Sequence, residues 1–176
     1  MKSVVTELLV KSPSECSKIE IAAFIAFVRT GGEVSIPGLA ERIRSAAVLV
    51  YARVDGLVIG AAALKQPKAS YRRRVSSASE TPLSVAEFPY EFGWVYVSPE
   101  WRGKGMSLLL SQTAIAASKG ACMFATSRTD NTAMHRSLTK VGFVAVGNPF
   151  VSGRGKHSLQ VFVRYAAQPI IPLDLS

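Results

Sequence analysis

One unit of the chain, between residues 90 and 127, constrains the fold more than any other: a strand, a glycine-rich turn, a helix and a second strand follow one another. The strands, "YEFGWVYV" at 90–97 and "ACMFATS" at 121–127, have apolar and aromatic composition. Two strands joined by a helix in this way form a parallel pair through a right-handed crossover. Between them, apolar or small residues recur at helical spacing, at Met106, Leu109, Leu110, Thr113, Ala114 and Ala117.

The N-terminal part of the chain is predicted to hold one short strand and two helices. The strand is "SVVTELLV" at 3–10. Ser12 can cap a helix and Glu15 can complete a capping box, so the first helix is expected to begin there and to end at Gly31. Its buried face would hold Ile21, Phe24, Ile25 and Val28. A second, shorter helix is expected after Pro37.

The rest of the chain adds a hairpin, a helix and two closing strands. Asp55 and Gly56 lie between two apolar runs and predict a β-hairpin with a tight turn. Asp130 or Asn131 can cap the last helix, which two strands follow. This order predicts an α/β protein in which about four helices flank a central mixed, mostly antiparallel sheet.

Length and composition fit a single domain. The chain has 176 residues, of which 48% are hydrophobic, and this is enough for one packed core. We predict one domain over residues 1–165 and a C-terminal tail over 166–176. Within the domain, residues 66–90 are polar, basic and rich in Ser and Pro, so they are expected to form a long loop, part of which could be helical.

The net charge of +9 is the main anomaly of the composition. It favours an anionic partner, which could be nucleic acid, an acidic surface or a phosphorylated small molecule. The two cysteines and two histidines lack the spacing of metal ligands, so no metal site is expected. The N-terminus lacks the apolar core of a signal peptide, and no run approaches the ~20 apolar residues of a membrane helix. The sequence therefore predicts a cytoplasmic protein without a membrane partner.

The turn that links the central strand and helix, within "VSPEWRGKGMSLLL" at 97–110, has the chemistry of an anion site. The first turn of a helix exposes N–H groups without partners, and the helix dipole adds positive charge there. Gly103 and Gly105 let an anion approach the backbone, and Arg102 and Lys104 add charge. By itself the turn could serve a phosphate or be a plain, solvated loop.

Two motifs give this turn a more specific interpretation. "VSPEWRGKGMSLLL" resembles the signature of the Gcn5-related N-acetyltransferases (GNAT), Arg/Gln-x-x-Gly-x-Gly/Ala. The matching residues are Arg102, Gly105 and Ser107, the last being a small-residue departure from the pattern. "DNTAMHRSLTKVGF" at 130–143 resembles the second signature of the family, a helix led by asparagine that ends in Lys-x-Gly-Phe.

The resemblance covers nearly the whole chain and implies a single-domain GNAT-like fold with acetyl-CoA as co-substrate. Backbone groups of Val95 and Val97 would pair with the pantetheine arm, and residues 102–107 would wrap the pyrophosphate. Asn131 would lie near the pantetheine or the acetyl group. The implied cofactor-binding residues are Val95, Tyr96, Val97, Arg102, Gly103, Lys104, Gly105, Met106, Ser107 and Asn131.

The resemblance also implies an acetyltransferase that moves an acetyl group to a primary amine by direct attack in a ternary complex. The amine must lose a proton, and Glu91 is the candidate base, because several relatives carry a catalytic glutamate at this place. Strand alternation predicts one face that holds Glu91, Gly93, Val95 and Val97, opposite Trp94 and Tyr96. The alternative is that Glu91 is an ordinary strand carboxylate.

The general acid is less clearly indicated. Many relatives have a tyrosine seven residues after the asparagine, but this chain has Leu138, which shares an apolar helix face and is expected in the core. Water, Ser137, Tyr96 or His135 could protonate the leaving thiolate instead. A solvent-side position is the simpler interpretation of His135.

The acceptor amine is left open: a small molecule, a peptide N-terminus, a lysine or aminoacyl-tRNA. "YRRRV" at 71–75 is either a lid that attracts an acidic substrate or a solvated basic loop. The alternative function is a non-catalytic acetyl-CoA-binding or nucleic-acid-binding module that keeps the GNAT fold. The closing strands could also pair between the subunits of a homodimer.

Overall fold

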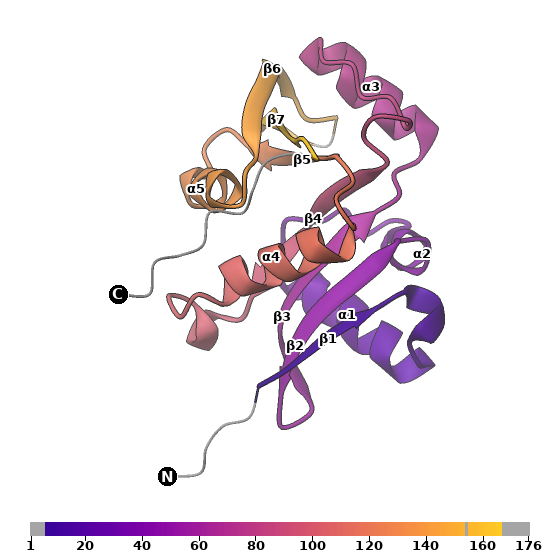
Figure 1. Cartoon of the computed structure of the whole chain (residues 1–176), viewed down its shortest axis with the longest axis vertical. Coiled ribbons are helices and arrows are strands. Elements are labelled where there is room, and N and C mark those ends of the chain that lie inside the picture. Colours follow the sequence, from indigo (N-terminus) through magenta and orange to yellow (C-terminus); the bar gives the residue numbers. More distant parts are fainter. Residues whose placement is uncertain (1–5, 154, 167–176) are drawn as a thin grey trace.

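A computed structural model, which describes residues 6–153 and 155–166, shows a seven-stranded sheet with helices on both faces (Figure 1). The strands are β1 (Thr6–Lys11), β2 (Val48–Val54), β3 (Leu57–Lys65), β4 (Tyr90–Val97), β5 (Met123–Arg128), β6 (Val144–Val151) and β7 (Ser158–Arg164). The helices are α1 (Lys18–Thr30), α2 (Leu39–Arg44), α3 (Ala69–Ser79), α4 (Met106–Ala117) and α5 (Thr132–Lys140), with short 3₁₀ turns at Pro13–Glu15 and Pro99–Trp101. The predicted α/β class is confirmed.

The strand order is β1-β2-β3-β4-β5-β7-β6, and the one parallel pair in it is β4 with β5. The helix α4 makes the crossover between these two strands, as the central unit of the sequence predicts. The hairpin of β2 and β3 turns at Asp55 and Gly56, both of which have the positive φ that a tight turn requires. β6 is an edge strand with Val144 and Val151 exposed, and the predicted pairing between subunits would have to form there.

Helices pack on both faces of the sheet. α4, which crosses in front of the strands in Figure 1, and α5 cover one face, over a core that includes Leu110 and Leu138. α1 and α2 cover the other face over β2 and β3, around Phe24 and Ile43. α3 covers that same face over β5 and β7, where Phe124 packs with it. In the part of the chain that the structure describes, no helix is long and apolar enough to cross a membrane.

The start of the first helix differs from the prediction. Ser12 and Glu15 do form a capping box, but it encloses only the single turn Pro13–Glu15. A second capping box, made by Ser17 and Glu20, starts α1 at Lys18. Two capping signals follow one another in the sequence, and only the second precedes the apolar periodicity that gives a helix a face to bury.

Residues 66–90 are not a structureless loop, because α3 lies within them. The helix brings the count to five α-helices in the described residues, one more than the rough expectation. Val75 is its main apolar anchor, and it packs with Leu83 and Phe88 of the following segment. The low hydropathy of this segment hides the helix, since one buried apolar residue gives no periodic pattern.

Candidate active site

β4 carries a bulge at its centre. Trp94 adopts a left-handed φ of +52°, which is rare for a bulky side chain. The pairing with β3 shifts at the same place, between Ala61 and Ala63. A bulge adds one residue to a strand, so the side chains beyond it alternate out of step with those before it.

The bulge changes which residues of β4 share a face. Val95 and Val97 pack into the core beneath α4. Glu91 points to the opposite face, where it bonds α3, and Trp94 packs with the α1 core. The ring of Tyr96 stacks against α1 as well. The prediction that Glu91 lies with Val95 and Val97, opposite Trp94 and Tyr96, is therefore wrong, because simple alternation does not survive a bulge.

After Glu91, β4 and β5 separate. Along these two fully described strands, pairing is confined to Tyr90 with Met123 and Glu91 with Phe124. Two cavities border this opening and share Val95, Tyr96, Asn131 and Met134 in their walls. The narrower one, of about 270 Å³, lies between β4, the glycine-rich turn and α5. The wider one is a groove of about 1260 Å³ between the α1–α2 loop and α3.

The narrower cavity contains six of the ten residues predicted to bind the cofactor. They are Val95, Tyr96, Val97, Arg102, Ser107 and Asn131. Gly103, Lys104 and Gly105 lie exposed in the adjoining turn, whereas the Met106 side chain is buried in the core beneath α4. Only the backbone of Met106 can therefore take part in binding there.

The turn before α4 is held open by its own residues. Gly103 and Gly105 have φ of +72° and +76°, and a Cβ atom on either would meet no atom of the described chain within 4 Å. The left-handed backbone, rather than crowding, is thus what requires glycine here. Arg102 donates from Nε to the Val97 carbonyl oxygen at 3.0 Å, which ties the turn to the end of β4.

α4 starts at Gly105 without a side-chain cap, so its first-turn N–H groups are directed toward the open turn. Lys104 lies with its Nζ 4.8 Å from the centre of the Trp101 ring, beside the same turn. N–H groups, a helix dipole and two cations at an open turn fit an anionic ligand. These features meet the chemical requirement of a pyrophosphate.

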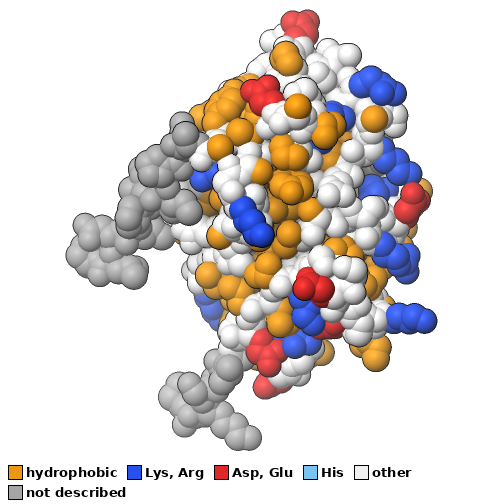
Figure 2. All heavy atoms as spheres, turned by 45° about the vertical axis from the view of Figure 1, so that its right-hand side comes forward, with side chains coloured by type: hydrophobic (Ala, Val, Ile, Leu, Met, Phe, Trp, Pro, Cys, Tyr) orange, Lys and Arg blue, Asp and Glu red, His pale blue; other side chains and the backbone are white. Residues whose placement is uncertain are grey.

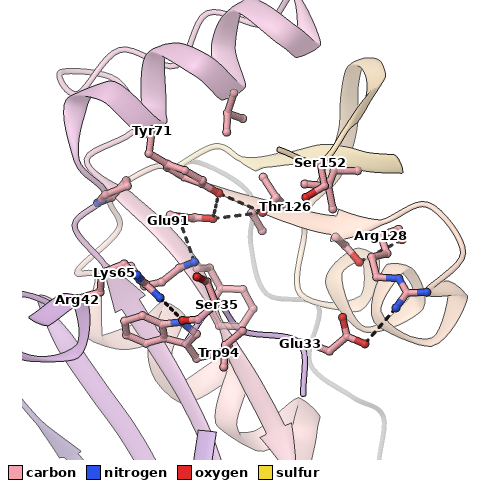
Figure 3. A pocket seen from close by; sticks show the side chains of 18 of the residues that line it. Glu33, Ser35, Arg42, Lys65, Tyr71, Glu91, Trp94, Thr126, Arg128 and Ser152 are labelled. Carbon is pink, nitrogen blue, oxygen red and sulfur yellow. Dashed lines mark hydrogen bonds and ion pairs between the residues drawn. The ribbon is translucent and has the colours of Figure 1, made fainter. Parts of the chain in front are cut away.

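Glu91 lies at the floor of the wide groove and is only 3% exposed. Both of its oxygens have partners (Figure 3). Oε1 accepts hydrogen bonds from the Tyr71 hydroxyl at 2.9 Å and the Thr126 hydroxyl at 3.3 Å. Oε2 lies 3.0 Å from Nζ of Lys65, whose ammonium also sits over the Trp94 ring at 5.4 Å.

Tyr71 joins α3 to this carboxylate. Burial, and secondly the charge of Glu91, raise the pKa of Tyr71 well above its usual value near 10. The hydroxyl therefore stays protonated at neutral pH and acts as a donor to Glu91. Sequence reasoning missed Lys65 as a site residue and named Tyr71 only as part of the basic segment at 71–75. Lys65 is the cross-strand partner of Glu91, a signal that becomes readable only once the register of β3 and β4 is known.

The candidates for the general acid lie in different places. Leu138 is 2% exposed in the core, as predicted. His135 bonds the Arg128 carbonyl oxygen through Nε2 at 2.9 Å, and its ring packs on Phe162. Ser137 borders the narrow cavity but not the wide groove. Within the described chain, Tyr96 is the one hydroxyl residue that borders both cavities.

Asn131 begins α5, and its Oδ1 accepts a hydrogen bond from the Met134 N–H at 3.1 Å. The asparagine therefore caps the helix while it borders the opening between β4 and β5. This explains why an asparagine leads the second motif at this place. Asp130 pairs with Arg128 instead.

The family model of the acetyltransferase (GNAT) family matches residues 18–143, most of the chain. The chain belongs to the GNAT acetyltransferase family. The resemblance seen in the sequence is thereby confirmed, and both motifs, at 97–110 and 130–143, lie inside the matched region. GNAT proteins use acetyl-CoA, which agrees with the anion-binding character of the turn before α4.

Solved GNAT structures share the fold at low sequence identity. An acyl-CoA N-acyltransferase from Pseudomonas aeruginosa superposes with a TM-score of 0.63 at 14% identity, covering 91% of this chain and 99% of that one. YncA, a putative acetyltransferase from Salmonella typhimurium solved with acetyl-CoA, gives 0.63 at 17% identity over 94% and 98%. A ribosomal-protein-alanine N-acetyltransferase from Brucella melitensis gives 0.61 at 17% over 89% and 99%. No curated protein sequence matches the chain significantly.

Proposed function

We propose that this GNAT protein transfers the acetyl group of acetyl-CoA to a primary amine, by direct attack in a ternary complex. The observation that carries the proposal is the junction of two cavities at the opening between β4 and β5. One cavity adjoins the open, basic turn before α4, and the other ends at a buried carboxylate. Two reactants can thus reach one point from opposite faces of the sheet.

Acetyl-CoA fits the narrow cavity and the turn beside it. The proposed contacts are the backbone of Val95 and Val97 for the pantetheine arm and the turn 102–107 for the pyrophosphate. The separated β4 edge supports the first contact, since its N–H and C=O groups face no strand there. Acetyl-CoA supplies the thioester, whose C–S bond breaks as the amide C–N bond forms.

We propose Glu91 as the general base. An ammonium that enters the wide groove would compete with Lys65 for Oε2, while Tyr71 and Thr126 hold Oε1 in place. Burial at the floor of the groove keeps bulk water from the carboxylate and strengthens its interaction with the amine. Tyr96 is our candidate for protonation of the leaving thiolate, because it borders both cavities.

The first test is the binding of acetyl-CoA. A ligand that binds only the folded state increases the free energy of unfolding, by about 2.7 kcal/mol when its concentration is a hundred times Kd. The melting temperature therefore rises. We expect such a rise with acetyl-CoA, and turnover of amines followed as release of free thiol. If acetyl-CoA leaves the melting temperature unchanged at saturating concentration, the proposal fails.

The second test separates the enzyme from a binding module. Stabilisation by acetyl-CoA without thiol release from any amine would favour a non-catalytic acetyl-CoA-binding module. Binding of RNA with a steep salt dependence, and no turnover, would favour a nucleic-acid module. On the face drawn in Figure 2, many of the Lys and Arg side chains lie along the right-hand edge, and apolar and neutral side chains cover the centre.

A further inference from the structure

The wall of the wide groove carries more cations than carboxylates. The basic residues are Arg42, Lys65, Lys68, Arg74 and Arg128, and the acidic ones are Glu33, Glu41 and Glu91. A concave wall with an excess of one charge favours a ligand of the other sign. The groove is where the proposed acetyl acceptor would enter, so its charges bear on the identity of the acceptor.

Each acidic residue of this wall is already paired with a cation. The pairs are Glu91–Lys65 at 3.0 Å, Glu41–Lys68 at 3.1 Å and Glu33–Arg128 at 3.5 Å. A polyamine or a lysine-rich peptide would therefore have to displace an existing ion pair for each contact that it makes. The groove is poorly matched to a polycationic acceptor.

Two further cations of the wall, Arg42 and Arg74, are not members of these three pairs, and they differ in what they contact. Arg42 donates to the Ser35 and Pro37 carbonyl oxygens at 2.5 and 2.7 Å, and so holds the loop between α1 and α2. Arg74 is exposed on α3, and no carboxylate of the described residues pairs with it. Its guanidinium lies over the Tyr71 ring, 5.5 Å from the ring centre.

The position of Arg74 relates it directly to the proposed base. The face of the Tyr71 ring meets Arg74. The hydroxyl of the same ring donates to Glu91 at 2.9 Å (Figure 3). The cation and the carboxylate therefore stand about one tyrosine side chain apart along the same wall. A ligand that contacted both would carry its amine and its anionic group several bonds apart.

We propose that the acceptor is a small primary amine with a carboxylate several bonds away, and that Arg74 binds this carboxylate. An ω-amino acid and the N-terminal amine of a short peptide both have this chemistry. A guanidinium can bind a carboxylate through two parallel hydrogen bonds, which gives orientation as well as affinity. The inference rests on the proposed acetyltransferase function and adds the class of its substrate.

The probes are ω-amino acids of increasing length, from glycine to 6-aminohexanoate, each compared with the alkylamine of equal length. Thiol release gives kcat/KM for every compound. We expect kcat/KM to rise with length among the amino acids and to exceed that of the matched alkylamine by about tenfold at the optimum, as for a charge-assisted hydrogen bond. Phosphoethanolamine tests whether a phosphate replaces the carboxylate.

Two variants assign the effect to Arg74. Arg74→Ala should remove the advantage of the amino acid over the alkylamine, mainly through KM, and Arg74→Glu should reverse it. Arg73→Ala is the matched control, because Arg73 is exposed on the same helix but does not border the groove. Its amino acid preference should equal that of the unmodified protein.

Each outcome bears on one part of the proposal. Equal kcat/KM for amino acids and alkylamines, or an unchanged preference in Arg74→Ala, would overturn the inference while the acetyltransferase function stands. A preference for phosphoethanolamine would overturn the assignment of a carboxylate as the anionic group of the acceptor. If acetyl-CoA stabilises the protein but no amino acid is acetylated, the inference also fails. Failure of acetyl-CoA to bind would overturn the proposed function itself.

Discussion

Three consecutive arginines on α3 show how strongly a residue's role depends on its direction. Successive residues of a helix point about 100° apart, so Arg72, Arg73 and Arg74 face three environments. Arg72 is 5% exposed, Arg73 faces solvent, and Arg74 borders the groove. The interpretation of this segment as a solvated basic loop is therefore wrong for Arg72. Tyr71 and Arg74 line the groove, and this agrees better with the alternative interpretation, in which the segment is a lid that attracts an acidic substrate.

Arg72 is a structural residue, and its removal should destabilise the protein. Its guanidinium donates to the carbonyl oxygens of Leu83, Phe88 and Pro89 and lies 5.2 Å from the centre of the Phe124 ring. Arg72→Ala would leave buried carbonyl oxygens without a hydrogen-bond donor and would also create a cavity. We therefore expect a loss of about 3 kcal/mol in the free energy of unfolding. Denaturant unfolding measures this loss.

The control for this variant is the next residue along α3. Arg73→Ala removes an exposed side chain and should change the free energy of unfolding by less than about 0.5 kcal/mol. Similar losses for the two variants would contradict a buried, carbonyl-binding role for Arg72.

Glu91 is the residue on which the proposed chemistry depends. We expect Glu91→Gln to reduce kcat by about a hundredfold or more, because the amide cannot accept the proton of the ammonium. Glu87→Gln, four residues earlier and exposed, should leave kcat unchanged. Steady-state rates at several pH values measure the effect, and circular dichroism checks the fold. Full activity of Glu91→Gln would remove Glu91 as the base.

At the scale of elements, Glu20 connects three of them, α1, β1 and β2, through hydrogen bonds. Its carboxylate accepts a hydrogen bond from Lys11 of β1 at 2.7 Å and from the Tyr51 hydroxyl of β2 at 3.0 Å. It also accepts from the Ser17 N–H at 2.8 Å, which completes the capping box of α1. The Lys11 bond is the largest cause that lowers the pKa of Glu20 to about 2, from an ordinary value of 4.5.

This depressed pKa predicts a specific dependence of stability on pH. The carboxylate of Glu20 is ionised in the folded state down to about pH 2, so its contribution is complete above pH 4.5 and is lost as the pH falls from 4.5 toward 2. Glu20→Gln should therefore be less stable than the unmodified protein at pH 7, by about 1 kcal/mol. The difference should shrink below pH 4.5.

Thermal unfolding of both proteins between pH 7 and pH 2.5 measures this difference. Glu7→Gln provides the comparison, since Glu7 pairs with Arg53 on the surface and is 56% exposed. Exposed pairs contribute little, so this variant should follow the unmodified protein at all pH values. A Glu20→Gln difference that is constant with pH would argue against an ionised, bonded Glu20.

At the scale of the whole molecule, the two cavities enter from opposite faces of the sheet and meet where β4 and β5 separate. Under the proposed function, this arrangement would let both reactants be bound at once and would require no covalent acetyl-enzyme. Cys122, which precedes β5, belongs to the cluster beneath α3 and borders neither cavity. The global layout thus supports direct transfer in a ternary complex.

Steady-state kinetics test this layout. With acetyl-CoA and amine varied together, we expect intersecting double-reciprocal lines, as for a sequential mechanism. Parallel lines, or an acetylated cysteine in the mass spectrum after incubation with acetyl-CoA alone, would contradict direct transfer. Cys122→Ser should retain the kcat of the unmodified protein.

Much of the fold was predictable because interactions between residues close in the sequence determine it. Turn chemistry at Asp55 and Gly56, the glycines before α4 and the cap at Asn131 each act within a few residues. The place of α3 within residues 66–90 was not predictable, since a buried arginine and a single valine hold the helix in place rather than an apolar stripe. The first capping box shows the same limit, because a cap without a following apolar face encloses only one turn.

The sequence by itself determined the order of the strands and of every helix but α3, the parallel crossover, the glycine turn and the family, because motifs and periodicity depend on neighbouring residues. Only the tertiary structure decided what surrounds Glu91. A one-residue bulge at Trp94 moved Val95 and Val97 to the other face, and α3 brought Tyr71 to the carboxylate. Register and helix docking are set by contacts between distant segments, so no local pattern records them.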